Sequence, residues 1–403
     1  MQKVKLGKNN RVLMIEPCYE NFGGYFRAFN LASALSKKGI HVDLVLSSRK
    51  KFFIGIAKKR INPLLTQYEL PRIEISFLVN GRILRGIINC FFILFKRYDI
   101  IHFFTIVQLE TTIPFLLFIL PLKKRIVIDW DDYWSGINKT SLYYNKFGGI
   151  LMRFFQLCEY RIQKLALHAT TTSNFLLKEL KKIGVKNTLK IINCVNEEEY
   201  TPISRTTARK QLNIDKNQKM LLTFGNTFFR ERTVLLLRFI EKIVSFDTSI
   251  QLYMNIDPKH LIFENAQDFK FSESIFRNIT TVGYLDKKKL AQYIGATDAI
   301  IFFMGDSTYE KACFPIRIGT FLNGGRTIVI NDTNTEASRI LNEYGCAVTE
   351  KDINALASKT VKLLNNKNEQ LVYEKKSLIA KRELLWSTQI NKLIAFYSAM
   401  SVN

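Results

Sequence analysis

The chain of 403 residues is long enough for two or three domains, and with 47% hydrophobic residues, 23% charged residues and only 8 prolines it has the composition of a folded protein. This excludes a single small module, a disordered chain and a collagen-like chain. The formal net charge is +24, and about two thirds of the excess lies in residues 1–200. Such an excess favours binding to polyanions or anionic lipid surfaces, although a solvated basic face gives the same count.

The first half alternates short β-rich segments with longer helical segments, which is the pattern of stacked βα units around a parallel sheet. Ser173 is the predicted N-cap of one of these helices. The predicted helices include residues 24–38, 145–166 and 173–183, and the predicted strands are residues 11–16, 41–46, 99–104, 125–130, 169–172 and 189–194.

Gly23 and Gly24 follow the first predicted strand and begin a helix that also contains Arg27. Adjacent glycines let the backbone approach a ligand closely, and a helix N-terminus favours oxyanions or hydroxyl groups. A simple tight turn explains the same pair. The spacing is not that of a dinucleotide-binding fingerprint.

Two apolar stretches, residues 87–95 and 112–122, have about half of the 20 residues that a membrane-spanning helix needs. They are either buried helices or strands, or a surface that docks on an anionic leaflet. Basic residues flank both stretches, namely Arg82, Arg85, Lys96, Arg97 and Lys123 to Arg125.

Three carboxylates, Asp129, Asp131 and Asp132, lie at the end of the strand predicted over residues 125–130. Carboxylates this close repel one another, so they normally face cations, sugar hydroxyls or water. We predict hydroxyl binding or general-base duty. A site for Mg²⁺ or Mn²⁺ and helix capping stay open as alternatives.

The alternation restarts after the polar stretch of residues 196–219 and predicts a second doubly wound unit, with a boundary near residue 205. The carboxyl ends of the strands in such units surround the ligand site, so the loops that follow the strands should carry the function. The predicted strands are residues 219–224, 251–255, 279–282, 299–303, 327–331 and 346–348.

Gly225 follows the first strand of the second half, and Arg230 and Arg232 lie just beyond it. A guanidinium binds phosphate oxygens bidentately and keeps its charge, so we predict that at least one arginine clamps a diphosphate. One of the two could instead pair with Glu231. Further along, the loop and helix of residues 306–325 present Glu310 and backbone N–H groups toward one pocket, although an ordinary βα connection has the same pattern.

The histidines and cysteines give no catalytic pattern. His102 and His168 fall on predicted strands, where a hydrogen-bonded core histidine is expected, and no Ser-His-Asp or Cys-His arrangement follows from the spacing. The six cysteines are isolated, which indicates a reducing compartment. The basic N-terminus runs straight into a predicted strand without an apolar signal segment, so we expect a cytoplasmic protein.

Taken in order, these loops resemble those of the glycosyl transferase group 1 proteins, the family 4 retaining glycosyltransferases of GT-B fold, over nearly the whole chain. The matching segments are residues 23–31, 38–42, 172–173 and 192–202 in the first half, and Gly225 with Arg230 or Arg232, residues 282–298 and residues 315–329 in the second; Trp386 and Tyr397 fit the family's C-terminal helix.

The resemblance implies an α/β protein of two doubly wound Rossmann-like domains that face each other across a cleft. Residues 1–204 would bind the acceptor, residues 205–384 would bind a nucleotide-sugar donor, and a helix over residues 385–403 would pack back on the first domain. It implies transfer of a sugar to an acceptor hydroxyl, with retention, without a cofactor or an obligatory metal. A lipid-linked or oligosaccharide acceptor in cell-envelope synthesis, with the enzyme peripheral on the inner face of the plasma membrane, is the expected setting.

The resemblance also implies the site residues. Glu310 takes the place of the first glutamate of the family's paired-glutamate motif, and Thr320 that of the second, which typically grips the ribose hydroxyls; a threonine cannot give that bidentate contact. Asp131 and Asp132 replace the usual His-Asp. The expected catalytic residues are Asp131, Asp132, Arg230, Arg232 and Glu310; the donor-binding ones are Gly225, Asn226, Arg230, Arg232, Glu310, Lys311, Ala312, Phe314, Arg317 and Thr320; the acceptor-binding ones are Gly23, Gly24, Arg27 and Asp131.

Other functions compete with sugar transfer. A nucleotide-sugar epimerase shares the two-domain fold and would need no acceptor. A scaffold with a decayed donor site is suggested by Thr320, and a metal-dependent transferase by the three aspartates at 129–132. Nucleic-acid binding comes last, because the basic residues are dispersed and form no recognised motif.

Overall fold

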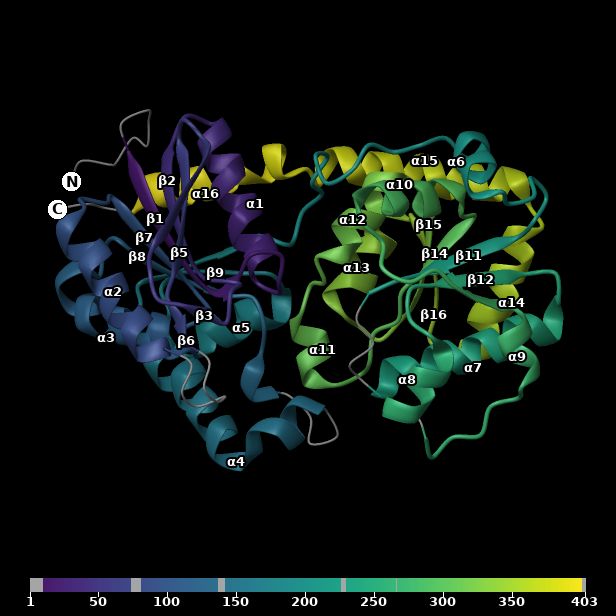
Figure 1. The fold of residues 1–403 in the computed structure, drawn as a ribbon, viewed down its shortest axis with the longest axis horizontal. Helices are drawn as coiled ribbons and strands as arrows, with labels where there is room; N and C mark the ends of the chain where they lie inside the picture. Colours follow the sequence, from purple (N-terminus) through teal and green to yellow (C-terminus); the bar gives the residue numbers. More distant parts are fainter. Residues whose placement is uncertain (1–9, 74–80, 137–141, 226–229, 266, 401–403) are drawn as a thin grey trace.

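The computed structural model describes residues 10–73, 81–136, 142–225, 230–265 and 267–400, and it contains two sheets between which the chain passes twice, once after β10 and once between α15 and α16 (Figure 1). The first sheet has eight strands in the order β10-β9-β8-β7-β1-β2-β5-β4, and the second has six in the order β13-β12-β11-β14-β15-β16. Among the described residues, neighbouring strands in both sheets run parallel, except for the β4–β5 hairpin. The prediction of an α/β protein with two doubly wound units is confirmed.

The first sheet and its helices are built from the N-terminal half of the chain. Its strands are β1 (Arg11–Tyr19), β2 (His41–Ser47), β4 (Ala57–Asn62), β5 (Leu65–Leu70), β7 (Ile100–Phe104), β8 (Ile126–Trp130), β9 (His168–Thr171) and β10 (Asn187–Lys190), and β3 (Phe52–Phe53) pairs separately with β6 (Arg72–Ile73). Its helices are α1 (Tyr25–Lys37), α2 (Arg82–Phe95), α3 (Leu109–Leu122), α4 (Leu142–Leu157) and α5 (Asn174–Lys182).

The second sheet and its helices follow the same plan. Its strands are β11 (Met220–Thr223), β12 (Gln251–Met254), β13 (Ile279–Thr281), β14 (Ala299–Ile301), β15 (Thr327–Asn331) and β16 (Ala347–Glu350). Its helices are α6 (Arg205–Leu212), α7 (Arg230–Phe246), α8 (Pro258–Asn265), α9 (Ser274–Arg277), α10 (Lys287–Ala296), α11 (Thr308–Ala312), α12 (Arg317–Gly324), α13 (Glu336–Tyr344), α14 (Ile353–Leu364) and α15 (Lys367–Glu383), and α16 (Trp386–Ala399) ends the chain.

The central strands are buried on both faces, because helices cover each side of both sheets. In the first sheet, α1 and α16 lie on one face and α2 and α3 on the other (Figure 1). In strands such as β7 and β8 every residue is therefore buried, and all are apolar except His102 and Asp129, as expected for parallel sheets.

The structure corrects several predicted elements. Three strands between residues 57 and 73 and the short β3 were missed. β4 and β5 form a polar hairpin at the edge of the first sheet, where sequence alternation is weak, and β3 and β6 have only two residues each and pair separately. The helix predicted over residues 145–166 ends at Leu157 and continues as a π turn and a 3₁₀ turn. The strand predicted over 189–194 is β10, which begins two residues earlier and ends at Lys190. Both apolar stretches are helices, α2 and α3.

The last helix crosses from the second sheet back to the first. Leu385 forms a β-bridge with Val195, and the Tyr397 hydroxyl lies 2.6 Å from Nδ1 of His102 on β7. α16 therefore packs against α1, far from the elements that precede it in sequence (Figure 1). The predicted boundary at residue 204/205 falls between the sheets, at Ser204, whose side chain caps α6.

No helix within the described ranges is both long and apolar enough to cross a membrane.

Candidate functional site

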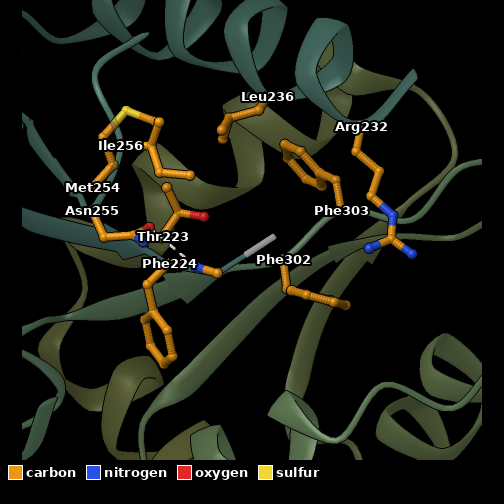
Figure 2. A pocket seen from close by; sticks show the side chains of 10 residues that line it. Thr223, Phe224, Arg232, Leu236, Met254, Asn255, Ile256, Phe302 and Phe303 are labelled. Carbon is orange, nitrogen blue, oxygen red and sulfur yellow. Dashed lines mark hydrogen bonds between the residues drawn. The ribbon is translucent and has the colours of Figure 1, made fainter. Parts of the chain in front are cut away.

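A pocket opens at the carboxyl ends of β11, β12 and β14, where a doubly wound sheet binds its ligands. The Gly225 N–H donates to the Asn255 Oδ1 at 3.1 Å, and Figure 2 shows Asn255 on one wall of the pocket. Arg232 reaches the opposite wall, beyond Phe303. The lining residues are Thr223, Phe224, Gly225, Arg232, Leu236, Met254, Asn255, Ile256, Phe302 and Phe303.

Arg317 lies directly against Gly225 at the edge of this pocket. A Cβ at Gly225 would fall 2.1 Å from the Arg317 guanidinium, and Gly225 has a φ of +104°, so only glycine fits here. Within the described part of the chain, Arg317 has no carboxylate partner. Burial, with a contribution from Arg232, lowers the Arg317 pKa to about 10. Arg317 is therefore a desolvated cation, still charged at neutral pH, for which an anion would be the natural partner.

The other two arginines of the predicted phosphate clamp are already paired with carboxylates. Arg232 forms a bidentate ion pair with Glu310, with Nε 2.7 Å from Oε1, and the Glu310 side chain is only 1% exposed. Arg230 instead pairs with Asp268 at 2.6 Å on the surface and lies over the Phe269 ring. Arg232 and Glu310 come together at the pocket, and Arg230 does not join them.

The remaining predicted donor residues lie in several places. Lys311 pairs with Asp306 at the surface at 2.6 Å, and Ala312 packs in the core beneath the first sheet. The Phe314 carbonyl accepts from Asn193 at 2.7 Å, so it belongs to the contact between the two halves. Thr320 is buried and its hydroxyl donates to Glu199. Asn226 lies outside the described residues.

Asp131 and Asp132 are both half-buried where the two halves of the chain meet. The Cys313 thiol donates to Asp132 Oδ1 at 3.0 Å, which joins the end of α11 to the loop after β8. Asp131 accepts from the Thr105 hydroxyl at 3.3 Å. Burial, with the repulsion between the two carboxylates, raises the Asp131 pKa well above the usual aspartate range, and burial also raises that of Asp132.

Arg27 and Asp129 form a buried ion pair. The guanidinium makes two hydrogen bonds to the carboxylate, at 2.8 and 3.2 Å, and a further Nη1 bond to the Ile191 carbonyl at 2.9 Å. Arg27 has 1% of its surface exposed, so the structure assigns it to holding α1 and β8 together. Asp129 is therefore neutralised by Arg27, whereas Asp131 is not in this ion pair, although the sequence analysis treated the three aspartates as one group.

The glycine pair at the start of α1 faces a carboxylate that the sequence analysis did not single out. A Cβ at Gly24 would lie 2.8 Å from the Glu16 carboxylate, so this glycine is needed whether or not a ligand binds. Glu16 Oε1 accepts from the Cys18 N–H at 2.9 Å, while Oε2 is buried without a hydrogen-bond partner. Burial, with the nearby Asp129 and Glu110, raises the Glu16 pKa to about 7. Its place at the end of the first strand was the signal that could have identified it.

Two predictions about polar core residues are confirmed. His102 and His168 are buried and hydrogen bonded, and burial lowers the pKa of each to about 4. The Ser173 side chain caps α5 by accepting from Leu176 N. In the described part of the chain, no group of three or more His, Cys, Asp or Glu side chains is arranged to hold a metal.

No protein-family model and no curated protein matches the sequence. Solved structures do match, over nearly the full length of both chains. The sucrose-phosphate synthase from Thermosynechococcus elongatus superposes with a TM-score of 0.72 at 16% identity, covering 96% of this chain and 98% of that one. The lipopolysaccharide glycosyltransferase WaaG gives 0.66 at 12% identity, covering 96% and 99%.

A third match is the trehalose-6-phosphate synthase OtsA, with a TM-score of 0.69 at 9% identity, covering 97% of this chain and all of that one. At these identities the likeness establishes the fold. The chain has the GT-B fold that the resemblance to group 1 glycosyltransferases implied.

Proposed function

We propose that this protein transfers a sugar from a nucleotide-diphosphate sugar to an acceptor hydroxyl, with retention of configuration. The observation that carries this proposal is the meeting of two sites. Arg232 lines the pocket at the end of the second sheet, which Arg317 edges, and its charge also acts on the half-buried Asp132 of the first half, which the Cys313 thiol at the end of α11 contacts.

The donor diphosphate is best accommodated beside Gly225 and Arg317. The missing side chain at Gly225 lets the Arg317 guanidinium lie directly against the backbone, and Arg317 supplies a charge that the described carboxylates do not neutralise. Arg232 adds a second positive group whose position is fixed by Glu310. Cations held in place beside the leaving phosphate stabilise the charge that develops as the glycosidic bond breaks, which is commonly the largest contribution to catalysis.

On the acceptor side, Asp131 or Asp132 orients the hydroxyl and removes its proton. A base is most effective when its pKa lies near the working pH, and burial raises the pKa of both carboxyls in that direction. With retention, the hydroxyl attacks the face that the diphosphate leaves. Gly23 and Gly24, at the start of α1, are the proposed floor of the acceptor site.

Known structures of the same fold support the substrate class. The trehalose-6-phosphate protein from E. coli was solved bound with UDP-2-fluoro glucose, and a Burkholderia xenovorans trehalose-phosphate synthase in complex with glucose-6-phosphate. For the present chain we propose a nucleotide-diphosphate sugar as donor, no required metal, and a lipid-linked or oligosaccharide acceptor of the cell envelope. We place the enzyme in the cytoplasm, at the inner face of the plasma membrane.

A thermal-shift screen of the purified protein against UDP, GDP, ADP, CMP and their sugar conjugates, with and without EDTA, tests the donor site. We expect stabilisation by one nucleoside diphosphate that EDTA leaves unchanged. A stabilisation that EDTA removes would instead favour the metal-dependent transferase, and no stabilisation at all would favour the scaffold. Donor consumption that needs no acceptor would favour the epimerase.

A further inference from the structure

One face of the first domain exposes an unusual number of large apolar side chains. They lie on α2 and α3, which pack side by side. A Cβ added at Gly86 of α2 would lie 3.1 Å from the Leu109 carbonyl oxygen of α3, and the Asn89 side chain of α2 donates to the Glu110 carbonyl of α3 at 2.9 Å. The exposed side chains, which we call the α2–α3 face, are Ile83, Leu84, Ile87, Phe91, Leu94 and Phe95 of α2 and Leu116, Leu117 and Leu120 of α3.

The spacing of these residues shows that they form one surface. Ile83, Ile87, Phe91 and Phe95 recur every four residues, so they form a stripe along α2. Phe95 is 78% exposed and Leu120 is 83% exposed. The opposite sides of both helices are buried against the sheet. Contiguous apolar surface of this kind marks an interaction site.

The charges around the α2–α3 face are almost all positive. Residues 82–97 and 111–125 contain no Asp or Glu. Three of the flanking basic residues are paired with carboxylates: Arg82 and Arg85 with Glu110, at 3.9 and 3.0 Å, and Lys96 with Asp43 at 3.3 Å. Arg97 after α2, and Lys123 to Arg125 after α3, precede the neighbouring parallel strands β7 and β8, so these basic residues lie at the same end of the face.

We propose that the α2–α3 face is the surface by which this protein docks on an anionic phospholipid leaflet. Apolar side chains at such a face enter the boundary between headgroups and acyl chains, while adjacent Lys and Arg side chains pair with anionic headgroups. A second copy of the chain fits less well, because a symmetric dimer would bring like charges together. The proposal specifies the membrane location given under the proposed function, but lipid binding does not depend on sugar transfer.

Docking through this face keeps the rest of the enzyme free of the membrane. α1 and α16 cover the opposite side of the first sheet, and the second sheet lies beyond the far end of the first domain from α2 (Figure 1). The helix that returns from the second domain therefore stays in solvent when α2 and α3 meet lipid.

Flotation with vesicles tests the proposal on the full chain. We expect the protein to float with vesicles of phosphatidylcholine and phosphatidylglycerol, and to stay at the bottom with phosphatidylcholine alone or in high salt. The triple variant Phe91→Glu, Phe95→Glu and Leu120→Glu should lower the partition coefficient at least about tenfold, because it removes the apolar contact and adds repulsion. The wild-type protein staying at the bottom with the anionic vesicles would overturn the proposal.

A matched control separates this face from a general effect of added charge. α15 also exposes apolar side chains, Leu371, Val372 and Ile379, each by 43% to 50%, but amid acidic and basic residues together. The variant Leu371→Glu, Val372→Glu and Ile379→Glu changes the net charge by the same amount and should float like the wild type.

Two outcomes would overturn the proposal even if the wild-type protein floats. If both triple variants lose vesicle binding equally, net charge and not the α2–α3 face governs binding. If the wild type is a dimer by light scattering without lipid and only the α2–α3 variant is monomeric, a second copy covers the face. Unchanged nucleotide stabilisation in the α2–α3 variant would show that docking and the donor site are separate.

Discussion

The Thr320 hydroxyl donates a hydrogen bond to the Glu199 carboxylate, with 3.0 Å between Oγ1 and Oε1. Thr320 occupies the position at which the resemblance implies a ribose-binding glutamate. Glu199 comes from the stretch between the two sheets, and burial raises its pKa while Thr320 and Lys287 oppose this. A carboxylate is therefore present at this position after all, supplied by a different part of the chain.

We expect Glu199→Gln to weaken donor binding, because an amide cannot accept two charge-assisted hydrogen bonds from vicinal hydroxyls. The KM for the nucleotide sugar should rise about tenfold with little change in kcat, and the thermal stabilisation by the nucleoside diphosphate should fall. Glu197→Gln, at an exposed neighbouring position, is the control and should behave like the wild type. Unchanged donor binding in Glu199→Gln would limit Glu199 to a structural role.

Arg317→Ala should abolish stabilisation by the nucleoside diphosphate while leaving the protein folded. No described carboxylate depends on Arg317, so its removal leaves no buried negative charge unpaired, and it relieves the cost of burying a cation. Arg317→Lys should retain part of the effect because it keeps the charge but not the bidentate geometry. Arg230→Ala serves as the control, since Arg230 pairs with Asp268 at the surface. A wild-type nucleotide shift in Arg317→Ala would remove Arg317 from the donor site.

Arg232→Ala, unlike Arg317→Ala, should lower the stability of the folded protein. Glu310 would be left buried without its partner, which costs about 3 kcal/mol in the free energy of unfolding. Urea denaturation measures this change. Arg232→Ala combined with Glu310→Ala should recover much of the lost stability, and a single variant as stable as the wild type would show that the ion pair is not maintained in solution.

The sequence predicted the fold well and the site only in part, for a physical reason. Strands such as β7 and β8 are apolar except for His102 and Asp129, so the local composition predicts that they are buried. Which arginine stays free is decided by pairing between distant residues, as Arg232 with Glu310 shows, and spacing does not reveal it. The Glu199–Thr320 contact spans 121 positions. No local pattern predicts a contact between residues so far apart in the chain.

The hydrogen bond between Tyr397 and His102 joins the last helix, α16, to the first domain. Tyr397→Phe should therefore weaken the packing of α16 on this domain. His102 is buried and neutral, and its Nδ1 would lose its partner at a cost of about 1–3 kcal/mol in the free energy of unfolding. In Tyr397→Phe, amide hydrogen exchange should speed up relative to the wild type more in α16 than in α15. Tyr344→Phe, which removes an exposed bond to Glu383, is the control and should leave exchange in α16 unchanged.

Asp131→Asn should lower activity and raise stability together. Burial and Asp132 raise the Asp131 pKa, so the folded protein holds this proton more tightly than the unfolded chain does. Its contribution to stability is therefore greatest below the pKa of the unfolded chain and is lost as the pH rises through the raised pKa of the folded protein. Asparagine removes that loss, so the variant should gain stability over the wild type at neutral and alkaline pH, as thermal unfolding across pH would show.

The activity of the same carboxyl depends on pH in the opposite sense. A general base works only when deprotonated, so kcat/KM of the wild type should rise with pH, with a midpoint above the usual range of an aspartate. Asp131→Asn should reduce kcat by about 10²–10⁴ and abolish this rise. If Asp131→Asn keeps the rise and Asp132→Asn loses it, Asp132 is the base; if both variants keep wild-type turnover, neither carboxyl takes the proton.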